Sequence, residues 1–366
     1  MASICGFPVC AGGKPKMKFT YTGDYVVRKD GVVELHSSGT LVFINPAVID
    51  LFMVGGGGSG YSLISASKWA GPGGGGGYTR TVRKVNVNPN TEITVTIGAG
   101  GASPNSSGGA SGFNTLTVDG GKRAEQGAGG AGGSGGGGSV MSNSDYGVGG
   151  SGGNNGESGF PVSVAGGKGQ GFHTGEFGEA TGKLYAGGGG GGRYMSATTP
   201  VVSAGGSGGG GAGGFQSAGA VQQAAAAGAA NTGGGGGGGA GVSSTHYVSG
   251  ASGGSGIVCF REAAPLPELA GTWVLHNRLY RPDEAFVETA NFEVSLDNTS
   301  FSPCVKADFQ TRALFLNIPN VGNLNVYSFN DNKWSRNYKY WKFTAEQASS
   351  FSDKFRTWLA SNATKQ

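Results

Sequence analysis

The sequence has few charged residues and no concentrated run of them. Of its 366 residues only 13% are Asp, Glu, Lys or Arg, and the formal net charge is +4. The densest cationic spots before residue 262 are the neighbours Arg83 and Lys84 and the pair Lys122 and Arg123. A nucleic-acid-binding surface needs a basic patch or stripe, and there is no Arg-Gly-Gly series to supply one. We therefore expect no nucleic-acid partner.

Cysteine and histidine are also scarce, with four residues of each. Cys5 and Cys10 could pair or share a metal, but no second pair of ligands lies near them, and a structural zinc ion takes four. Cys259 and Cys304 lie in apolar segments, where a cysteine behaves as a small buried hydrophobic residue. The sequence therefore indicates no disulfide framework, no metal site and no cofactor.

Long apolar runs are missing too. No segment approaches the length of a membrane span, so we expect no membrane insertion. The N-terminal residues 1–16 lack the basic region followed by an apolar stretch that marks a secretory leader. We interpret them as a tail, and we expect the protein to be made in a cytoplasm and not exported by the usual route.

What the chain has in excess is glycine, confined to one region. Seventy of its 78 glycines fall between Gly55 and Gly256, many in runs of four to seven, and only two follow Glu262. Such enrichment without a collagen repeat is typical of a disordered tether. The ordered alternative is polyglycine II, a left-handed helix with three residues per turn whose backbone polar groups bond to neighbouring helices. A Cβ atom would hold such backbones apart.

Segments rich in β-branched and aromatic residues flank and interrupt the glycine runs, which favours the ordered alternative. The strands that we expect here cover residues 18–27, 39–44, 48–54, 78–87, 91–97, 113–118 and 256–261. We predict a mainly β fold for residues 17–262. It would consist of a β-sandwich-like frame with an inserted bundle of polyglycine II helices, at about residues 55–256.

A Pro-containing linker at residues 263–269 separates this region from a glycine-poor domain, residues 270–366. Strand patterns in that domain cover residues 272–279, 286–296, 313–318, 325–329 and 338–343. Thr344 and Gln347 form a capping-box pattern, and apolar residues recur after them at helical spacing. We therefore predict a small α+β domain in which one helix packs on a sheet.

The segments between the glycine runs carry the side chains suited to recognition. They are rich in Ser, Thr, Asn and Tyr, the composition of adaptable binding loops, and they would lie at the ends of a helix stack. The aromatic anchors that we expect there are Tyr61, Trp69, Tyr146, Tyr194 and Tyr247. In the C-terminal domain Trp334, with Tyr338, Tyr340 and Trp341, could form a platform for a sugar ring or could equally pack under the closing helix.

Residues suited to catalysis are few. The four histidines are far apart in the sequence, and the close acidic pair in the glycine-rich region is Glu176 with Glu179. Paired carboxylates can hydrolyse a glycan, but these two could also face outward or cap backbone amides. We expect no enzyme activity and keep a polysaccharide hydrolase as an alternative.

Several motifs resemble known families. The strings IDLFMVGGGGSG, GPGGGGGYTRT, ITVTIGAGGASP, EFGEATGKLYAGGGGGG, NTGGGGGGG and GGSGIVCFR resemble the glycine-rich tail-tip and tail-fibre proteins of tailed bacteriophages and prophages, in order from about Phe19 to Arg261. GTWVLHNRLY, WSRNYKYWKFT and FRTWLASNATKQ resemble a C-terminal module on tail proteins of phages of gut Gram-positive bacteria. More loosely, the glycine-rich region is similar to the extracellular glycine-rich domain of anaplastic lymphoma kinase, which implies a β-sandwich with polyglycine helices in its loops.

These resemblances imply a virion tail protein that contacts the host as a receptor-binding adhesin. Its partners would be a host cell-surface glycan or surface protein, together with other phage tail proteins, and residues 1–16 would be a candidate virion attachment. Tail fibres are often trimers and tip adhesins can be monomers, so an oligomer, a trimer in the first place, is one expectation. The alternative is a structural spacer or a capsid-decorating fibre that recognises nothing.

Overall fold

The chain divides into two compact units, Met1–Ala263 and Ala264–Gln366. The structure is a computed structural model, and the elements assigned in it, β1 to β25, are all strands. The residues that it describes are 3–5, 17–63, 68–141, 147–153, 156–161, 165–169, 175–178, 182–195, 203–217, 222–263, 271–275, 305–308, 313–318, 322–330, 333–336, 340–343, 360 and 363–366.

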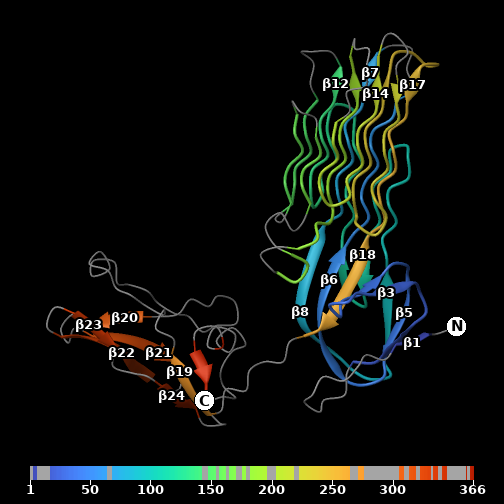
Figure 1. The fold of residues 1–366 in the computed structure, drawn as a ribbon. Helices are drawn as coiled ribbons and strands as arrows, with labels where there is room; N and C mark the ends of the chain where they lie inside the picture. Colours follow the sequence, from blue (N-terminus) through green and yellow to red (C-terminus); the bar gives the residue numbers. More distant parts are fainter. Residues whose placement is uncertain are drawn as a thin grey trace. The chain divides into compact units, whose positions relative to one another are not determined.

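The frame of the first unit is a sandwich of two antiparallel sheets (Figure 1). The first sheet contains, in spatial order, β1 (Ser3–Cys5), β2 (Phe19–Tyr21), β5 (Gly39–Phe43), β9 (Glu92–Thr96), β10 (Ser111–Phe113) and β11 (Leu116–Val118). The second contains, in spatial order, β3 (Tyr25–Val27), β4 (Val33–Leu35), β18 (Ile257–Glu262), β6 (Ala47–Val54) and β8 (Thr79–Val87). Alternation of buried and exposed residues along β9 shows one face turned to the core.

Aromatic and aliphatic side chains from both sheets fill the space between them. Phe260 of β18 makes edge-to-face contacts with Phe19 and Phe43 of the first sheet, with ring centroids 5.4 and 5.7 Å apart. All three rings are fully buried, as are Leu51 and Met53 of β6. The frame is therefore held by an ordinary hydrophobic core.

The seven strand regions expected before residue 262 all contain strands of this frame. Residues 18–27 hold two strands, β2 and β3, with a turn between them, and residues 113–118 lie in the hairpin of β10 and β11. Strand β4 has no counterpart among the expected strands. It has only three residues, and the charged Glu34 at its centre interrupts the apolar pattern. It pairs with β18 on one side and β3 on the other, so it is a central strand of its sheet.

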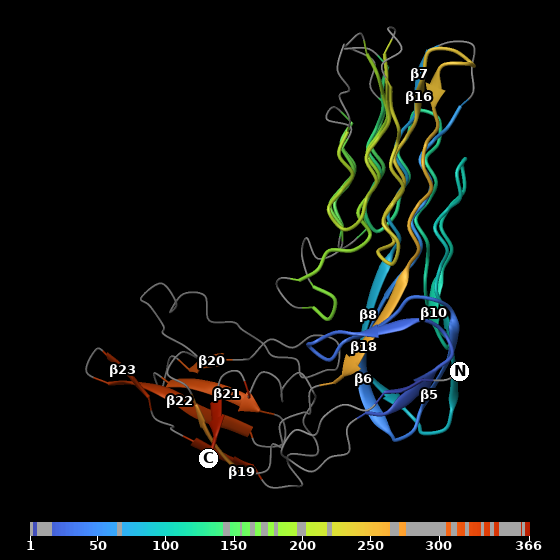
Figure 2. The same cartoon turned by 45° about the vertical axis from the view of Figure 1, so that its right-hand side comes forward.

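The glycine runs extend from the sandwich as backbones that lie side by side (Figures 1 and 2). Along residues 55–60 successive N–H groups donate to three neighbouring segments in rotation. The pairs are Gly55 to Tyr78 (3.0 Å), Gly58 to Gly75 (2.8 Å), Gly56 to Gly109 (2.9 Å), Ser59 to Ser106 (2.9 Å), Gly57 to Gly254 (2.9 Å) and Gly60 to Ala251 (2.9 Å). Because the partner segment recurs every third residue, the backbone has the threefold repeat of polyglycine II.

The next glycine run repeats the pattern. For residues 73–78 the pairs are Gly73 to Gly137 (2.9 Å), Gly76 to Ser134 (2.9 Å), Gly74 to Gly236 (2.8 Å), Gly77 to Gly233 (2.8 Å), Gly75 to Lys122 (3.0 Å) and Tyr78 to Asp119 (3.0 Å). A Cβ added at Gly57 would lie 2.0 Å from the carbonyl oxygen of Gly234, and one added at Gly76 would lie 1.9 Å from that of Ala186. The predicted bundle of polyglycine helices is therefore confirmed, and we call it the polyglycine stack.

Two small sheets lie at the end of the polyglycine stack that is farther from the sandwich (Figure 1). One contains β12 (Val140–Met141), β13 (Arg193–Tyr194), β14 (Phe215–Gln216) and β15 (Gln222–Gln223). The other contains β17 (Tyr247–Val248), β16 (Ala240–Gly241) and β7 (Trp69–Ala70). We call these seven strands, together with Tyr61, Lys68 and the turn at residues 242–246, the distal cap.

The second unit is described as two further sheets. The first contains β24 (Tyr340–Phe343), β19 (Gly271–Leu275) and β25 (Ala363–Lys365). The second contains β20 (Val305–Asp308), β21 (Ala313–Ile318), β22 (Gly322–Asn330) and β23 (Lys333–Arg336). The expected strand at residues 286–296 and the helix expected after Thr344 fall outside the described residues, so only the β part of the predicted α+β domain has support. Among the described residues no helix has the length and apolar character needed to cross a membrane.

Candidate functional site

The distal cap brings together Tyr61 and Trp69, two of the aromatic residues expected to anchor a partner. Their rings meet edge to face, with centroids 6.5 Å apart and an angle of 84°. Trp69 is only 5% exposed. It pairs with Gly241 across β7 and β16, where a Cβ would lie 2.3 Å from the indole nitrogen. The absence of a side chain at Gly241 therefore makes room for the indole.

A third expected anchor, Tyr194, lies in β13 of the other cap sheet and is also 5% exposed. The Nζ atom of Lys68 sits 5.3 Å from the centroid of its ring, in the range of a cation–π contact. Lys68 itself is exposed. The buried tyrosine thus positions a cation at the surface of the cap.

The turn between β16 and β17 supplies exposed hydroxyl groups beside Tyr247, which is half-buried. The backbone N–H of Val242 donates to the carbonyl of His246 at 2.9 Å. The Oγ1 atom of Thr245 lies 3.0 Å from Nδ1 of His246 and 3.2 Å from Oγ of Ser243. These local bonds hold a short polar loop in a defined shape.

The structure therefore places four of the six expected anchor residues, Tyr61, Trp69, Tyr194 and Tyr247, in the distal cap. Tyr146 lies outside the described residues. Trp334 belongs to β23 in the second unit. Trp69 and Tyr194 have their rings inside the cap. Neighbouring residues such as Lys68 and Thr245, and not these two rings, form its described surface. Lys68 and Thr245 lie in the Ser/Thr-rich segments. That composition was the only feature of the sequence that could have indicated their place on the surface.

Two polar atoms are buried in the cap without a partner. Within the described residues, the buried side-chain polar atoms that lack a hydrogen bond are Nε1 of Trp69 and Oε1 of Gln216. Trp69 lies in β7 and Gln216 lies in β14 next to Tyr194. An unpaired buried donor or acceptor costs about 1–3 kcal/mol, so the cap carries a cost that the described part of the frame does not.

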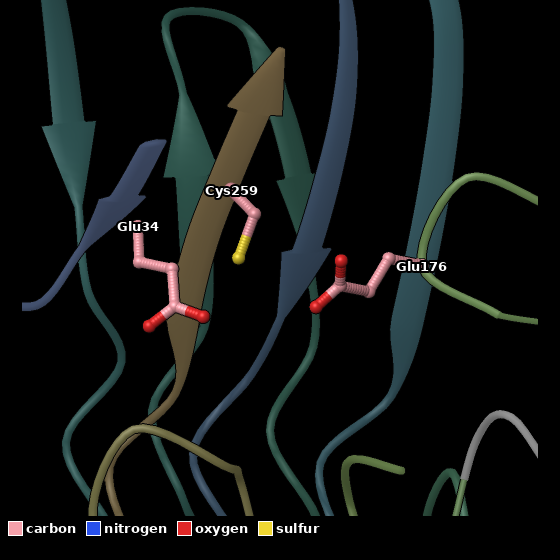
Figure 3. Close-up of side chains that lie close together, drawn as sticks. All are labelled: Glu34, Glu176 and Cys259. Atoms are coloured by element: carbon pink, nitrogen blue, oxygen red, sulfur yellow. The ribbon is translucent and has the colours of Figure 1, made fainter. Parts of the chain in front are cut away.

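A second cluster lies on the outer face of the five-stranded sheet, where Glu34, Glu176 and Cys259 converge (Figure 3). One possible ligand atom from each residue lies within 4.8 Å of the others, and all three residues are buried. Nη1 of Arg28, however, lies 2.7 Å from Glu176 and 3.3 Å from Glu34. Nζ of Lys183 lies 3.4 Å from Glu34. Protein cations already neutralise the two carboxylates.

The cysteine in this cluster is a buried, protonated thiol. Burial, assisted by the nearby charges of Glu176 and Glu34, raises the pKa of the Cys259 thiol well above its usual value. Metal binding requires the thiolate. Because Arg28 and Lys183 already occupy both carboxylates, the residues do not fit a metal ion.

The cluster instead fixes part of the glycine-rich insertion to the frame. The hydroxyl of Tyr185 donates to Glu176, and burial of that hydroxyl raises the pKa of Tyr185. The rings of Phe177 and Tyr185 pack on Phe52 of β6, with centroids 6.5 and 5.2 Å away. We call Arg28, Glu34 and Glu176 the clasp.

Glu34 carries the clearest electrostatic signature of the clasp. Burial alone would raise its pKa, but hydrogen bonds and charges from His36, Lys183 and Arg28 outweigh burial, and the pKa is lowered. Glu176, which we considered as one acid of a hydrolase, is only 6% exposed and is bound by Arg28 and Tyr185. Glu179 lies outside the described residues. In the described structure Glu176 serves the attachment of the insertion.

A sandwich frame, a polyglycine stack inserted in it and a cap on the stack together define a glycine-rich domain. The model of the glycine-rich domain family matches residues 36–263. The chain belongs to this family. No curated protein matches the sequence.

Proposed function

We propose that the protein is a phage virion tail protein that acts as a host-surface receptor-binding adhesin and makes its contact through the distal cap. The observation that carries this proposal is the position of the cap at the far end of the polyglycine stack (Figure 2). The resemblance of the glycine-rich and C-terminal motifs to tail proteins supplies the phage context.

The stack suits this role because it is stiff. Its buried N–H groups donate to neighbouring backbones in three directions, so each cap strand begins or ends on a fixed support. Preorganised loops lose little conformational freedom on binding, which leaves more of the contact energy as affinity. The unpaired Trp69 and Gln216 atoms are compatible with the same role, since buried polar groups without a partner are rare in native structures and call for a cause such as a binding role.

The contact surface that we propose combines half-buried aromatic residues with exposed polar ones. Tyr61 and Tyr247 keep part of their surface accessible, and Lys68, Thr245 and His246 are exposed. Trp69 and Tyr194 support this surface from inside the cap. Its partner would be a host cell-surface glycan or surface protein, while other tail proteins would hold the remainder of the chain in the virion, with a trimer as the favoured oligomer.

Binding of labelled protein to whole cells of a panel of gut Gram-positive bacteria tests the proposal. We expect the triple variant Lys68→Ala, Thr245→Ala, Tyr247→Ala to bind susceptible cells at least about tenfold more weakly, a loss of about 1.4 kcal/mol. The matched control changes two exposed residues of the frame, Val26→Ala and Lys29→Ala, and should bind like the wild type. Equal binding by the triple variant would exclude the cap as the contact.

A structural spacer is the second candidate, and burial of Trp69 and Tyr194 favours it. A spacer would need rigidity but no exposed anchor. Under this candidate the wild-type protein binds no strain of the panel, yet it remains incorporated in virions. Electron microscopy of labelled particles would then show whether the chain positions another tail protein.

A further inference from the structure

The sandwich has an open side at which a cavity reaches its core. The edge strands of the two sheets on this side are β8 and β11. Between the end of β8 and the β10–β11 hairpin lies a cavity of about 340 Å³. This volume falls at the lower end of the range of small-molecule sites, roughly 300–1,000 Å³. The cavity belongs to the frame, and no part of the proposed adhesin function uses it.

The floor of the cavity is apolar. Val87, Ile93 and Phe113 line it and are 4%, 6% and 3% exposed. All three belong to the core of the sandwich, and Val85 and Leu116 pack against that core beside them. Because Val87, Ile93 and Phe113 are almost fully covered, the apolar surface that a ligand would cover belongs mainly to the half-buried Val85 and Leu116.

The rim of the cavity is polar and uncharged. It carries three exposed asparagines, Asn86, Asn88 and Asn114, together with two threonines. Within the part of the chain that the structure describes, the carboxamide groups of Asn86 and Asn88 form no hydrogen bond with protein, and the same holds for Asn114. Each carboxamide offers two donors and one acceptor. None of the ten residues around the cavity is charged.

The rim is also held in shape before any ligand arrives. Asn90 and Asn114 have positive φ angles of 56° and 53°, a conformation that asparagine tolerates better than most residues. Their backbone N–H groups donate to Phe43 and Thr94, both at 2.8 Å. Farther along the same edge, Nη1 of Arg80 bridges from β8 to the carbonyl of Thr117 in β11 at 3.2 Å. The bond at Asn114 holds the hairpin that lines the cavity, whereas Asn90 and Arg80 lie outside the lining and hold the neighbouring turn and strand.

We propose that this cavity is a second binding site of the protein, for an uncharged sugar residue with one apolar ring face. The floor accepts the apolar face of the ring. The three carboxamides can donate to and accept from hydroxyl groups at its edge, and the absence of charge excludes a preference for acidic sugars. The chain would then bear two separate contacts, one on the distal cap and one on the frame.

Nuclear magnetic resonance titration of the full-length protein tests this site. The probes are glucose, rhamnose and N-acetylglucosamine, with glucuronate as the charged counterpart. We expect the side-chain amide signals of Asn86, Asn88 and Asn114 to shift with at least one neutral sugar and less with glucuronate. No shift with any neutral sugar, or a stronger response to glucuronate, overturns the proposal.

A pair of variants locates the site. Asn114→Gly removes a rim carboxamide at a positive φ that glycine adopts freely, so folding should be preserved, and sugar affinity should fall roughly tenfold. Asn90→Gly makes the same change in the neighbouring turn, outside the cavity lining, and should leave affinity unchanged. If both variants bind alike, the sugar lies elsewhere and the assignment is wrong. Shifts produced by a short apolar peptide and by no sugar would also overturn it, since the cavity would then receive a protein partner.

Discussion

The frame and the polyglycine stack exclude water by two different means. In the frame, rings such as Phe19 and Phe260 fill the space between sheets. In the stack, residues such as Gly57 and Gly189 are equally buried but have no side chain, and the neighbouring backbones themselves occupy the interior. The frame gains stability mainly from apolar burial, whereas the stack depends on pairing almost every backbone polar group. Close packing alone therefore does not require a hydrophobic sequence.

The difference should appear as different sensitivity to substitution. The frame loses stability when a side chain is removed, because a cavity remains. The stack should lose stability when a side chain is added, because a single Cβ meets a main-chain oxygen that cannot rotate away. Opposite changes in residue volume therefore distinguish the two regions.

The largest effect is expected in the frame. Phe260→Ala removes a fully buried ring that contacts Phe19 and Phe43 and should lower the free energy of unfolding by about 3–5 kcal/mol. Denaturant unfolding, monitored by circular dichroism, measures this free energy of unfolding. Val26→Ala, at a side chain that is 49% exposed, should change it by less than about 0.5 kcal/mol. Similar values for the two variants would contradict the assigned core.

Adding one carbon to the stack should have the next largest effect. Gly57→Ala places a Cβ 2.0 Å from the Gly234 oxygen and should cost about 1–3 kcal/mol or more, since the backbones must separate. In the Gly57→Ala variant the backbone amides at residues 55–60 should also exchange their hydrogens with solvent faster than in the wild type. Gly153→Ala is the control within the stack, because its nearest contact would be 3.3 Å. Equal protection in both variants would mean that the glycines are not packed as described.

The clasp joins the two regions and should have the smallest effect. Glu34→Gln should cost about 1 kcal/mol at neutral pH, because it removes the charge that Arg28 and Lys183 face. The pKa of Glu34 is lowered by folding from 4.5. Its stabilising contribution is therefore present above the unfolded pKa and is lost as the pH falls below about 4.5.

The pH dependence of unfolding checks this prediction. Wild-type stability should fall more steeply in acid than that of Glu34→Gln, and the two curves should converge at low pH. Glu125→Gln is the matched control, because Glu125 is exposed and lies 3.8 Å from Arg123; it should change stability by less than about 0.5 kcal/mol. Parallel acid curves for wild type and Glu34→Gln would show that the clasp does not titrate as described.

Local sequence patterns sufficed to predict most strands of the frame and to predict that the insertion consists of polyglycine helices. The runs at residues 48–54 and 256–261 are β-branched and apolar, and they pair as β6 and β18. The glycine runs themselves indicated a packing that tolerates no Cβ. The sequence could not predict which runs lie next to one another, because every run has the same local sequence. Only the folded chain shows that Gly57 donates to Gly254 rather than to another glycine.

The candidate site was less predictable. Aromatic residues in the segments between glycine runs indicated where the cap lies, but burial depends on the partner strand, and Gly241 opposite Trp69 carries no sign of that role in the sequence. The clasp depends on Glu34 and Glu176, which are distant along the chain and converge only in three dimensions. Side chains that act through long-range contacts leave no periodic pattern to detect.

The threefold bonding of the stack also limits how such a protein can change length during evolution. Inserting one residue into a single glycine run would rotate every later N–H toward the wrong neighbour, since the partner recurs every third residue. An insertion of three residues would restore the rotation but leave the adjacent runs too short to receive it. Lengthening therefore requires concerted change in many runs, whereas the turn at residues 242–246 bonds within itself and can vary without altering the runs.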